Sequence, residues 1–370
     1  MQFIDLKSQY LRIKDMVSNN IQTVLNSGQY IMGAEISQLE KELSVYVGVK
    51  HCLSCASGTD ALLIPLMAWG IGEGDAVFTT PFTFIATAEV ISLVGATPIF
   101  VDIDRDTFNI NPELLDEAIQ KVKNERKLNA KAIIPVDLFG LCANYSRINE
   151  IAKKHNLIVL EDAAQAFGAV QNGKKSCSFG TAAATSFFPA KPLGCYGDGG
   201  AVFTDDDNLI EIMKSIRIHG QGSDKYENVR IGLNGRMDTI QAAVLLAKLT
   251  IFDEEIELRN IIAKRYNELL KDKLVVPFTP EDNISVWAQY SVLAKSSEER
   301  QKIQDALKQK GIPTAIYYPI PLHLQKAYSY LNYKQGDFPV SEEIAKRVFS
   351  LPMHPYLTEE EQKNICNAIA

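Results

Sequence analysis

A single lysine, Lys191, lies inside a stretch of aromatic, proline and glycine residues that runs from Ser186 to Gly200. A lysine amine attacks a carbonyl only in its neutral form, which proteins obtain by desolvation or by nearby cations. The surroundings of Lys191 are unlike a solvated helix face, and they favour a reactive amine. Schiff-base chemistry with a carbonyl compound is therefore the first hypothesis. A solvated surface lysine is the alternative that this motif leaves open.

Carboxylates end the apolar run Leu160-Glu161-Asp162, where a strand is predicted to reach the edge of a sheet. A carboxylate at such a place can hold a cation. In enzymes that use pyridoxal phosphate (PLP), an aspartate keeps the pyridine nitrogen protonated, which preserves the ring as an electron sink. Gln165 follows closely and is placed to reach the phenolic oxygen of such a cofactor. An aspartate that only caps the next segment is the alternative.

Two more motifs follow predicted strands. In Ser57-Gly58-Thr59, the glycine permits close backbone approach, and two hydroxyls add donors to the N–H groups of the following helix. This pattern predicts an anion site, although a plain helix N-cap is the alternative, and the Gly-Lys-Ser/Thr of a P-loop is absent. Phe84, in the motif Phe82–Thr87, is placed to stack on a planar cofactor, but core packing explains a lone phenylalanine equally well.

Short β-rich runs alternate with helical stretches from about residue 49 to 204. This alternation predicts an α/β fold, with a mostly parallel sheet flanked by helices. Asn111-Pro112 marks a helix start, because a capping residue precedes a proline at the first helical position. The predicted strands are 76–79, 97–102, 132–136, 157–160, 185–188 and 201–204.

The pattern changes after about residue 245. A long charged amphipathic helix over about 250–272 and an alternating strand over 286–292 indicate a smaller α+β domain. Capping boxes at Ser296 and Thr358 start its helices, and Gly311 ends one. We therefore expect a large domain over 12–245 and a small one over 246–370, with residues 1–11 packed near the small one. The active site is expected between these lobes, near the strand ends.

Composition narrows the class of partner. The 370 residues are 46% hydrophobic and 22% charged, with a formal net charge of −7, which disfavours nucleic acid as a partner. No apolar run is long enough to span a membrane, and the N-terminus lacks a secretory signal, so a cytoplasmic location is expected. The six cysteines are scattered without zinc spacing; we expect reduced thiols and no metal.

Five motifs in the same order and spacing resemble the DegT/DnrJ/EryC1/StrS family of sugar aminotransferases. They are Ser57–Thr59, Thr83–Thr87, Glu161–Gln165, Ser186–Lys191 and Gly197–Gly200. The resemblance extends over essentially the whole chain and implies a fold-type I PLP-dependent aminotransferase. It also implies a homodimer whose active sites lie at the subunit interface.

The resemblance assigns roles to individual positions. Lys191 looks like the lysine that bonds covalently to PLP, and Asp162 like the partner of the pyridine nitrogen. Gln165 would bond the phenolic oxygen, and Phe84 would stack on the ring. The positions that resemble phosphate ligands are Gly58, Thr59, Ser186 and, from the second subunit, Asn234. The positions that resemble lining residues of the sugar-nucleotide pocket are Arg236, His219, Tyr318 and His323.

The stretches 187–200, 318–322 and 351–356 look most like the members that aminate C3 of a UDP-linked 2-acetamido-2-deoxy-3-keto-glucuronate, for a surface polysaccharide or glycan. Glutamate is the expected amino donor. Amination at C4 of a 4-keto-6-deoxy sugar and a PLP-binding regulator without turnover stay open as alternatives. A sugar dehydratase is disfavoured because that subgroup typically has histidine at the position of Lys191. A nicotinamide enzyme is disfavoured because no Gly-x-Gly-x-x-Gly follows a strand.

Overall fold

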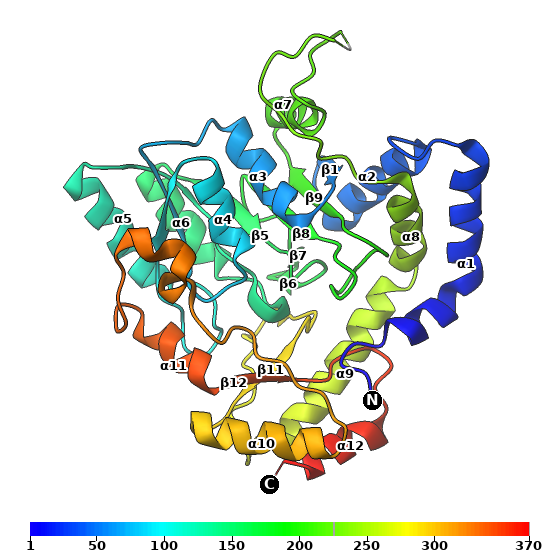
Figure 1. The fold of residues 1–370 in the computed structure, drawn as a ribbon, viewed down its shortest axis with the longest axis vertical. Coiled ribbons are helices and arrows are strands. Elements are labelled where there is room, and N and C mark those ends of the chain that lie inside the picture. The colour runs from blue at the N-terminus through cyan, green and yellow to red at the C-terminus, as the bar shows by residue number, and fades with distance from the viewer. Residues whose placement is uncertain (225, 370) are drawn as a thin grey trace.

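The computed structural model describes residues 1–224 and 226–369 (Figure 1). Its centre is a seven-stranded sheet with the strand order β1-β9-β8-β5-β4-β2-β3. Strand β9 runs antiparallel to both of its neighbours, β1 and β8, whereas the pairs β5–β8, β4–β5, β2–β4 and β2–β3 are parallel. The mostly parallel α/β fold predicted from the sequence is confirmed. The strands are β1 (His51–Cys55), β2 (Asp75–Thr79), β3 (Thr97–Phe100), β4 (Asn129–Ile133), β5 (Ile158–Asp162), β8 (Ala182–Ser186) and β9 (Gly200–Thr204).

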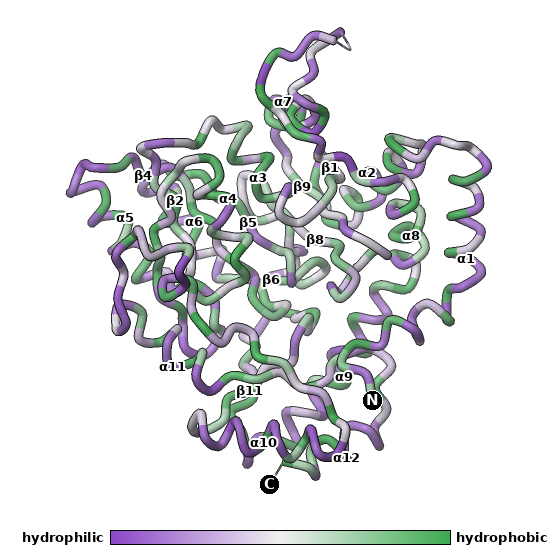
Figure 2. The backbone as a smooth tube through the Cα atoms, viewed as in Figure 1, coloured by the Kyte–Doolittle hydropathy of each residue, from purple (hydrophilic) through white to green (hydrophobic). Residues whose placement is uncertain are grey.

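Helices cover both faces of this sheet. One apolar core joins it to α3 (Gly58–Ala68), α4 (Ala86–Leu93) and α7 (Asp207–Arg217). Another joins the opposite face to α2 (Ala34–Val47), α5 (Pro112–Glu125), α6 (Tyr145–His155) and α8 (Thr239–Leu249). Figure 2 shows the hydrophobic residues gathered along the inner strands, while outlying helices such as α10 (Ser297–Gln309) are largely hydrophilic. Helix α1 (Leu6–Ser27) packs on α8.

A separate apolar core lies in the C-terminal part of the chain, around the antiparallel pair β11 (Tyr290–Leu293) and β12 (Val348–Leu351). It takes residues from α9 (Phe252–Leu270), α10 and α12 (Glu359–Asn367). The predicted boundary between residues 245 and 246 lies within α8, and the carbonyl of Phe3 accepts a hydrogen bond from the N–H of Met353 at 3.2 Å. The division into two domains stays a prediction.

The remaining elements are short, apart from α11. They are β6 (Val170–Gln171), β7 (Lys174–Lys175), β10 (Asn283–Ile284), the 3₁₀ turns η1 (Leu138–Gly140), η2 (Leu322–Leu324) and η3 (Lys326–Leu331), and α11 (Pro339–Arg347). Within the described residues, no helix has the length and apolar character that a membrane span requires. All six cysteines are buried free thiols.

Several predicted boundaries differ from the structure. The predicted start of a helix at Asn111-Pro112 is confirmed, since the Asn111 side chain caps α5. Strand β4 begins three residues before the predicted 132, and the predicted strand 286–292 is reduced to Tyr290–Leu293. The reason for the second difference is that residues 286–289 bond to the turn around Gly140 instead of to a strand.

Candidate active site

One edge of the sheet brings the predicted phosphate motif together. Cys55, at the end of β1, and Ser186, at the end of β8, both pair with Gly200, which begins β9. A Cβ atom on Gly58 would lie 2.6 Å from the Cβ of Ser186, and one on Gly200 would lie 2.3 Å from the carbonyl oxygen of Ser57. Only glycine permits this approach, which sets the start of α3 against Ser186.

The start of α3 has the features of an anion site. Ser57 is its N-cap, and the Ser57 hydroxyl accepts a hydrogen bond from the N–H of Asp60 at 3.1 Å. Gly58 and Thr59 form the first turn, where backbone N–H groups have no partner within the helix. Together with the adjacent Ser186 hydroxyl, this turn offers donors to a phosphate at the positive end of the helix dipole.

Asp162 ends β5 at the same edge and is buried. The Thr87 hydroxyl donates to Asp162 Oδ2 at 2.7 Å, and the N–H of Ala164 donates to Oδ1 at 3.2 Å. Burial raises the pKa of Asp162, while these two bonds and the charge of Lys191 oppose the rise. Thr87 lies in a motif that the sequence singled out, yet its role as the residue that orients Asp162 was missed. The sequence feature that could have indicated this role is the spacing of four residues between the hydroxyls of Thr83 and Thr87, which places them on one face of a helix.

Lys191 lies in the loop between β8 and β9. Its N–H donates to the carbonyl of Phe188 at 2.8 Å, which folds the loop into a tight turn. Desolvation lowers the pKa of Lys191 to about 8, although the negative charge of Asp162 acts in the opposite direction. A substantial fraction of the amine is therefore neutral near physiological pH, as nucleophilic attack on a carbonyl requires.

Gln165 is held from two sides. The N–H of Phe139 donates to its Oε1 at 2.9 Å, and its Nε2 donates to the hydroxyl of Tyr318 at 3.1 Å. The Tyr318 ring lies 6.4 Å from that of Phe84, whose side chain is 56% exposed. An exposed aromatic ring beside a fixed amide and a buried carboxylate is a suitable surface for a planar, polar cofactor.

The segment 232–238 lies next to this edge because the carbonyl of Gly235 accepts a hydrogen bond from the N–H of Ala56 at 3.0 Å. Asn234 is exposed on it. The Nε of Arg236 is buried and has no hydrogen-bond partner within residues 1–224 and 226–369. His219 is exposed and has a positive φ of 64°. The ligand roles of these residues stay predictions.

His323 has an environment that differs from that of an open pocket. Its side chain is 0% exposed, its Nε2 lies 3.1 Å from Glu342 Oε1, and its ring packs against Phe338. Burial lowers its pKa. Arg217, at the end of α7, is likewise buried and pairs with Glu40 at 2.6 Å. Neither side chain is presented to a ligand in this conformation.

Two buried carboxyls, Asp137 and Glu161, lie behind the site. Both are 0% exposed, and the negative charge of Glu161 adds to the effect of burial on Asp137. The N–H of Asp137 also donates to the carbonyl of Asp162 at 3.0 Å. Desolvation raises the pKa of Glu161 to about 7 and that of Asp137 well above its usual value. Burial thus favours the protonated form of both groups, next to the backbone of Asp162.

We expect the stability of the protein to fall as pH rises because of this pair. The folded state keeps a proton on the buried Glu161, whereas the unfolded chain loses it above the usual value of 4.5 for glutamate. Stability is therefore lost from about pH 4.5 upward through the folded pKa of about 7, at about 1.4 kcal/mol per unit of raised pKa. Asp137→Asn removes one of the two carboxyls with a raised pKa, so the free energy of unfolding by urea is expected to differ less between pH 5 and pH 8 than in the wild type.

The surface carboxylate Glu359 provides the control, since its pKa is lowered by Lys363 and it is ionised throughout this range. Glu359→Gln is expected to keep the wild-type difference between pH 5 and 8. An Asp137→Asn protein whose stability falls with pH as steeply as the wild type would contradict the contribution of Asp137 to this pH dependence.

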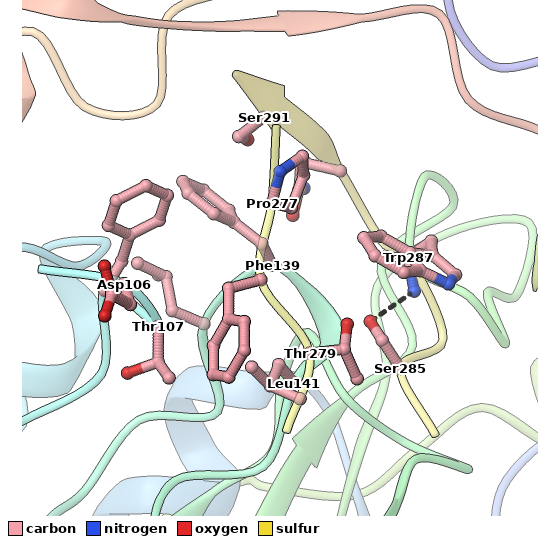
Figure 3. Close-up of a pocket in the computed structure, with 13 residues that line it drawn as sticks. Asp106, Thr107, Phe139, Leu141, Pro277, Thr279, Ser285, Trp287 and Ser291 are labelled. Carbon is pink, nitrogen blue, oxygen red and sulfur yellow. Dashed lines mark hydrogen bonds between the residues drawn. The ribbon is translucent and has the colours of Figure 1, made fainter. Parts of the chain in front are cut away.

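Figure 3 shows a cavity where the turn around Phe139 meets the strand region near Trp287. The N–H of Trp287 donates to the hydroxyl of Ser285 at 3.1 Å in its wall. Phe139, whose N–H holds Gln165, also lines this cavity. The residues predicted for cofactor and substrate are not among its lining residues.

Comparisons with known proteins agree with this geometry. Residues 12–370 match the DegT/DnrJ/EryC1/StrS aminotransferase family. A UDP-2-acetamido-2-deoxy-3-oxo-D-glucuronate aminotransferase from Pseudomonas aeruginosa is 50% identical, over 100% of this chain and 99% of its own length. A pleiotropic regulatory protein from Geobacillus stearothermophilus is 43% identical, over 99% of this chain and 97% of its own length.

Solved structures give the same result. A DegT/DnrJ/EryC1/StrS aminotransferase from Brucella abortus has a TM-score of 0.97 and 52% identity, with 100% of this chain and 98% of that chain covered. A protein from Streptococcus pneumoniae in a PLP form has a TM-score of 0.89 and 26% identity, with 96% and 95% covered. The chain belongs to the DegT/DnrJ/EryC1/StrS family, the PLP-dependent aminotransferases that act on sugar nucleotides.

Proposed function

We propose that this enzyme moves an amino group from glutamate to C3 of a UDP-linked 2-acetamido-2-deoxy-3-keto-glucuronate. The observation that carries the proposal is that the buried Asp162 ends β5 near enough to the turn of Lys191 for the two charges to act on each other, while desolvation lowers the pKa of Lys191 to about 8. The 50% identity to the Pseudomonas aeruginosa enzyme over the full chain supports the choice of sugar.

The residues at the edge fit PLP. Gly58 lies so close to Ser186 that a Cβ atom on it would clash, and the Ser186 hydroxyl and the backbone N–H groups at the start of α3 are suitable donors for a phosphate. Asp162 would hold the pyridine nitrogen, Gln165 the phenolic oxygen and Phe84 one face of the ring. When bound, PLP supplies an electron sink that stabilises negative charge on the carbon attached to the transferred nitrogen.

Lys191 has two tasks in this proposal. When PLP is present, the neutral amine of Lys191 would hold it covalently in the resting enzyme, with loss of water. Once displaced by the amino donor, the same amine would take the proton from the donor carbon and return it as a general base and acid. It would serve in the same way when nitrogen passes to the keto-sugar. A pKa of about 8 lies close to working pH, where such proton transfer is most efficient.

Arg236 is the best-placed candidate for the sugar's carboxylate. Its segment is bonded to Ala56 beside the start of α3, and its buried Nε has no partner within the described residues. A guanidinium can bind a carboxylate through two parallel hydrogen bonds. His219, Tyr318 and His323 remain further candidates for the pocket wall, with Tyr318 the one in contact with Gln165.

We propose a homodimer in which Asn234 reaches the partner's phosphate site. The segment between α7 and α8 extends away from the body of the molecule (Figure 1), and it exposes apolar side chains, with Val229 52% and Ile231 85% exposed. A second copy of the chain is the occupant that would cover them. Light scattering of the purified protein is expected to give twice the mass of one chain; the mass of a single chain would overturn this part of the proposal.

The test of the function is the visible absorbance of the PLP-loaded protein. Glutamate is expected to convert the bound cofactor to its amino form, and only the UDP-linked 3-keto-uronate is expected to restore the original band. Restoration by a 4-keto-6-deoxy sugar nucleotide would instead assign C4 amination. A bound band that no amino donor changes would support a regulator, the class to which the name of the Geobacillus stearothermophilus relative points.

A further inference from the structure

A second buried lysine, Lys248, lies on α8 behind the loop that carries Lys191. Its side chain is 1% exposed, and its Nζ donates a hydrogen bond to the carbonyl of Gly194 at 2.6 Å. The same ammonium lies 4.4 Å from the centre of the Tyr196 ring. Burying an ammonium group costs free energy unless hydrogen bonds compensate for the lost water. A role beyond packing is therefore expected for this lysine.

Gln241 adds a second contact from the same helix face, two turns before Lys248. Its Oε1 accepts a hydrogen bond from the N–H of Tyr196 at 2.8 Å. A Cβ atom on Gly197 would lie 2.8 Å from Gln241 Nε2, so the loop runs directly against this side chain. Helix α8 therefore contacts the returning half of the loop at three positions, Gly194, Tyr196 and Gly197.

The outgoing half of the loop is closed onto the returning half. The N–H of Cys195 donates to the carbonyl of Phe187 at 2.8 Å, and the N–H of Phe187 donates to the carbonyl of Gly199 at 2.7 Å. A Cβ atom on Gly194 would lie 2.6 Å from the carbonyl oxygen of Phe188. Lys191 lies within the loop that these bonds close. The carbonyl of Gly194, where the loop returns, accepts the hydrogen bond from Lys248.

We propose that Lys248, with Gln241, is a positioning residue that fixes the loop of Lys191 at the distance and angle its amine needs. It acts through its hydrogen bond to the Gly194 carbonyl. The titratable groups that act on Lys248 itself are Glu255 of α9 and the thiol of Cys195 in the loop.

Lys248→Met tests the bond, since methionine keeps the length of the side chain and removes the donor. A displacement of about 1 Å at a reacting atom costs about 10²-fold, so kcat is expected to fall by about that factor, with KM for glutamate within about twofold of wild type. In the protein without PLP, hydrogen exchange of residues 187–199 is expected to accelerate.

Lys273→Met is the matched control. Lys273 also donates to backbone carbonyls, those of Cys366 and Ile369 at 3.1 and 2.5 Å, but in the C-terminal core away from the loop. It is expected to leave kcat and loop exchange unchanged. Equal losses in both variants, or a Lys248→Met enzyme with kcat within threefold of wild type, would overturn the inference. If Lys248→Met fails to fold, Gln241→Leu is tested in its place. Wild-type values of kcat and of hydrogen exchange in Gln241→Leu would also overturn the inference.

The inference rests on the proposed role of Lys191, which borohydride reduction and peptide mapping test separately. A reduced cofactor attached to another residue overturns the proposed function. A reduced cofactor attached to Lys191, together with unchanged kcat in Lys248→Met, overturns only the role of Lys248.

Discussion

Lys191→Ala is expected to lower kcat for transamination by about 10⁴-fold or more. The variant loses both the covalent anchor of the cofactor and the group that moves the proton, and proton transfer by a positioned side chain alone contributes about 10²–10⁴-fold. The measurement is single-turnover formation of 2-oxoglutarate from glutamate by the PLP-loaded protein.

The exposed Lys153 of α6 supplies the control for this variant. Lys153→Ala is expected to keep the wild-type rate, with the same melting temperature as Lys191→Ala to within a few degrees. Ordinary turnover in a Lys191→Ala preparation free of wild-type enzyme would remove Lys191 from the mechanism.

Asp162→Asn is expected to lower kcat by about 10²–10³-fold, the usual effect of removing one preorganised electrostatic group from an active site. The shape of the side chain is unchanged, and the Thr87 hydroxyl can still donate to the amide oxygen. What disappears is the negative charge that would keep the pyridine nitrogen protonated.

The same substitution has a second, independent readout. The charge of Asp162 raises the pKa of Lys191, so its removal is expected to lower that pKa further below about 8. The pH dependence of Lys191 modification by an amine-reactive reagent, in protein without PLP, measures this shift. A variant with an unchanged modification profile and kcat within threefold of wild type would show that the two groups do not act together.

The central elements of the site were predictable because each is local in sequence. An apolar run that ends in Asp162, a Gly-Thr pair after Ser57 and a lysine among Phe and Pro residues each indicate their own chemistry. Strand order, by contrast, depends on pairings between distant segments. The sequence therefore predicted the mostly parallel sheet but not the antiparallel direction of β9.

Side-chain environments set by tertiary contacts were harder to predict. His323 follows a motif typical of a pocket wall, yet Glu342 and Phe338 enclose its ring. Lys248 was missed, although a lone lysine in the apolar run of residues 242–249 was a usable signal of a buried amine. Both depend on which helix packs over them, and hydrophobic periodicity does not specify that partner.

The direction of β9 also bears on the order in which the chain assembles. Strands β8 and β9 are joined by a short loop and pair as neighbours, whereas β1 pairs with β9 across about 150 residues of intervening chain. Closing a long loop costs more entropy than closing a short one, so we expect the β8–β9 hairpin, with its lysine, to form before β1 docks. Gly58 reaches Ser186 only after that docking. The capacity to hold a phosphate is then acquired only when β1 docks, and we expect a folding chain to present its reactive amine before it can retain a cofactor.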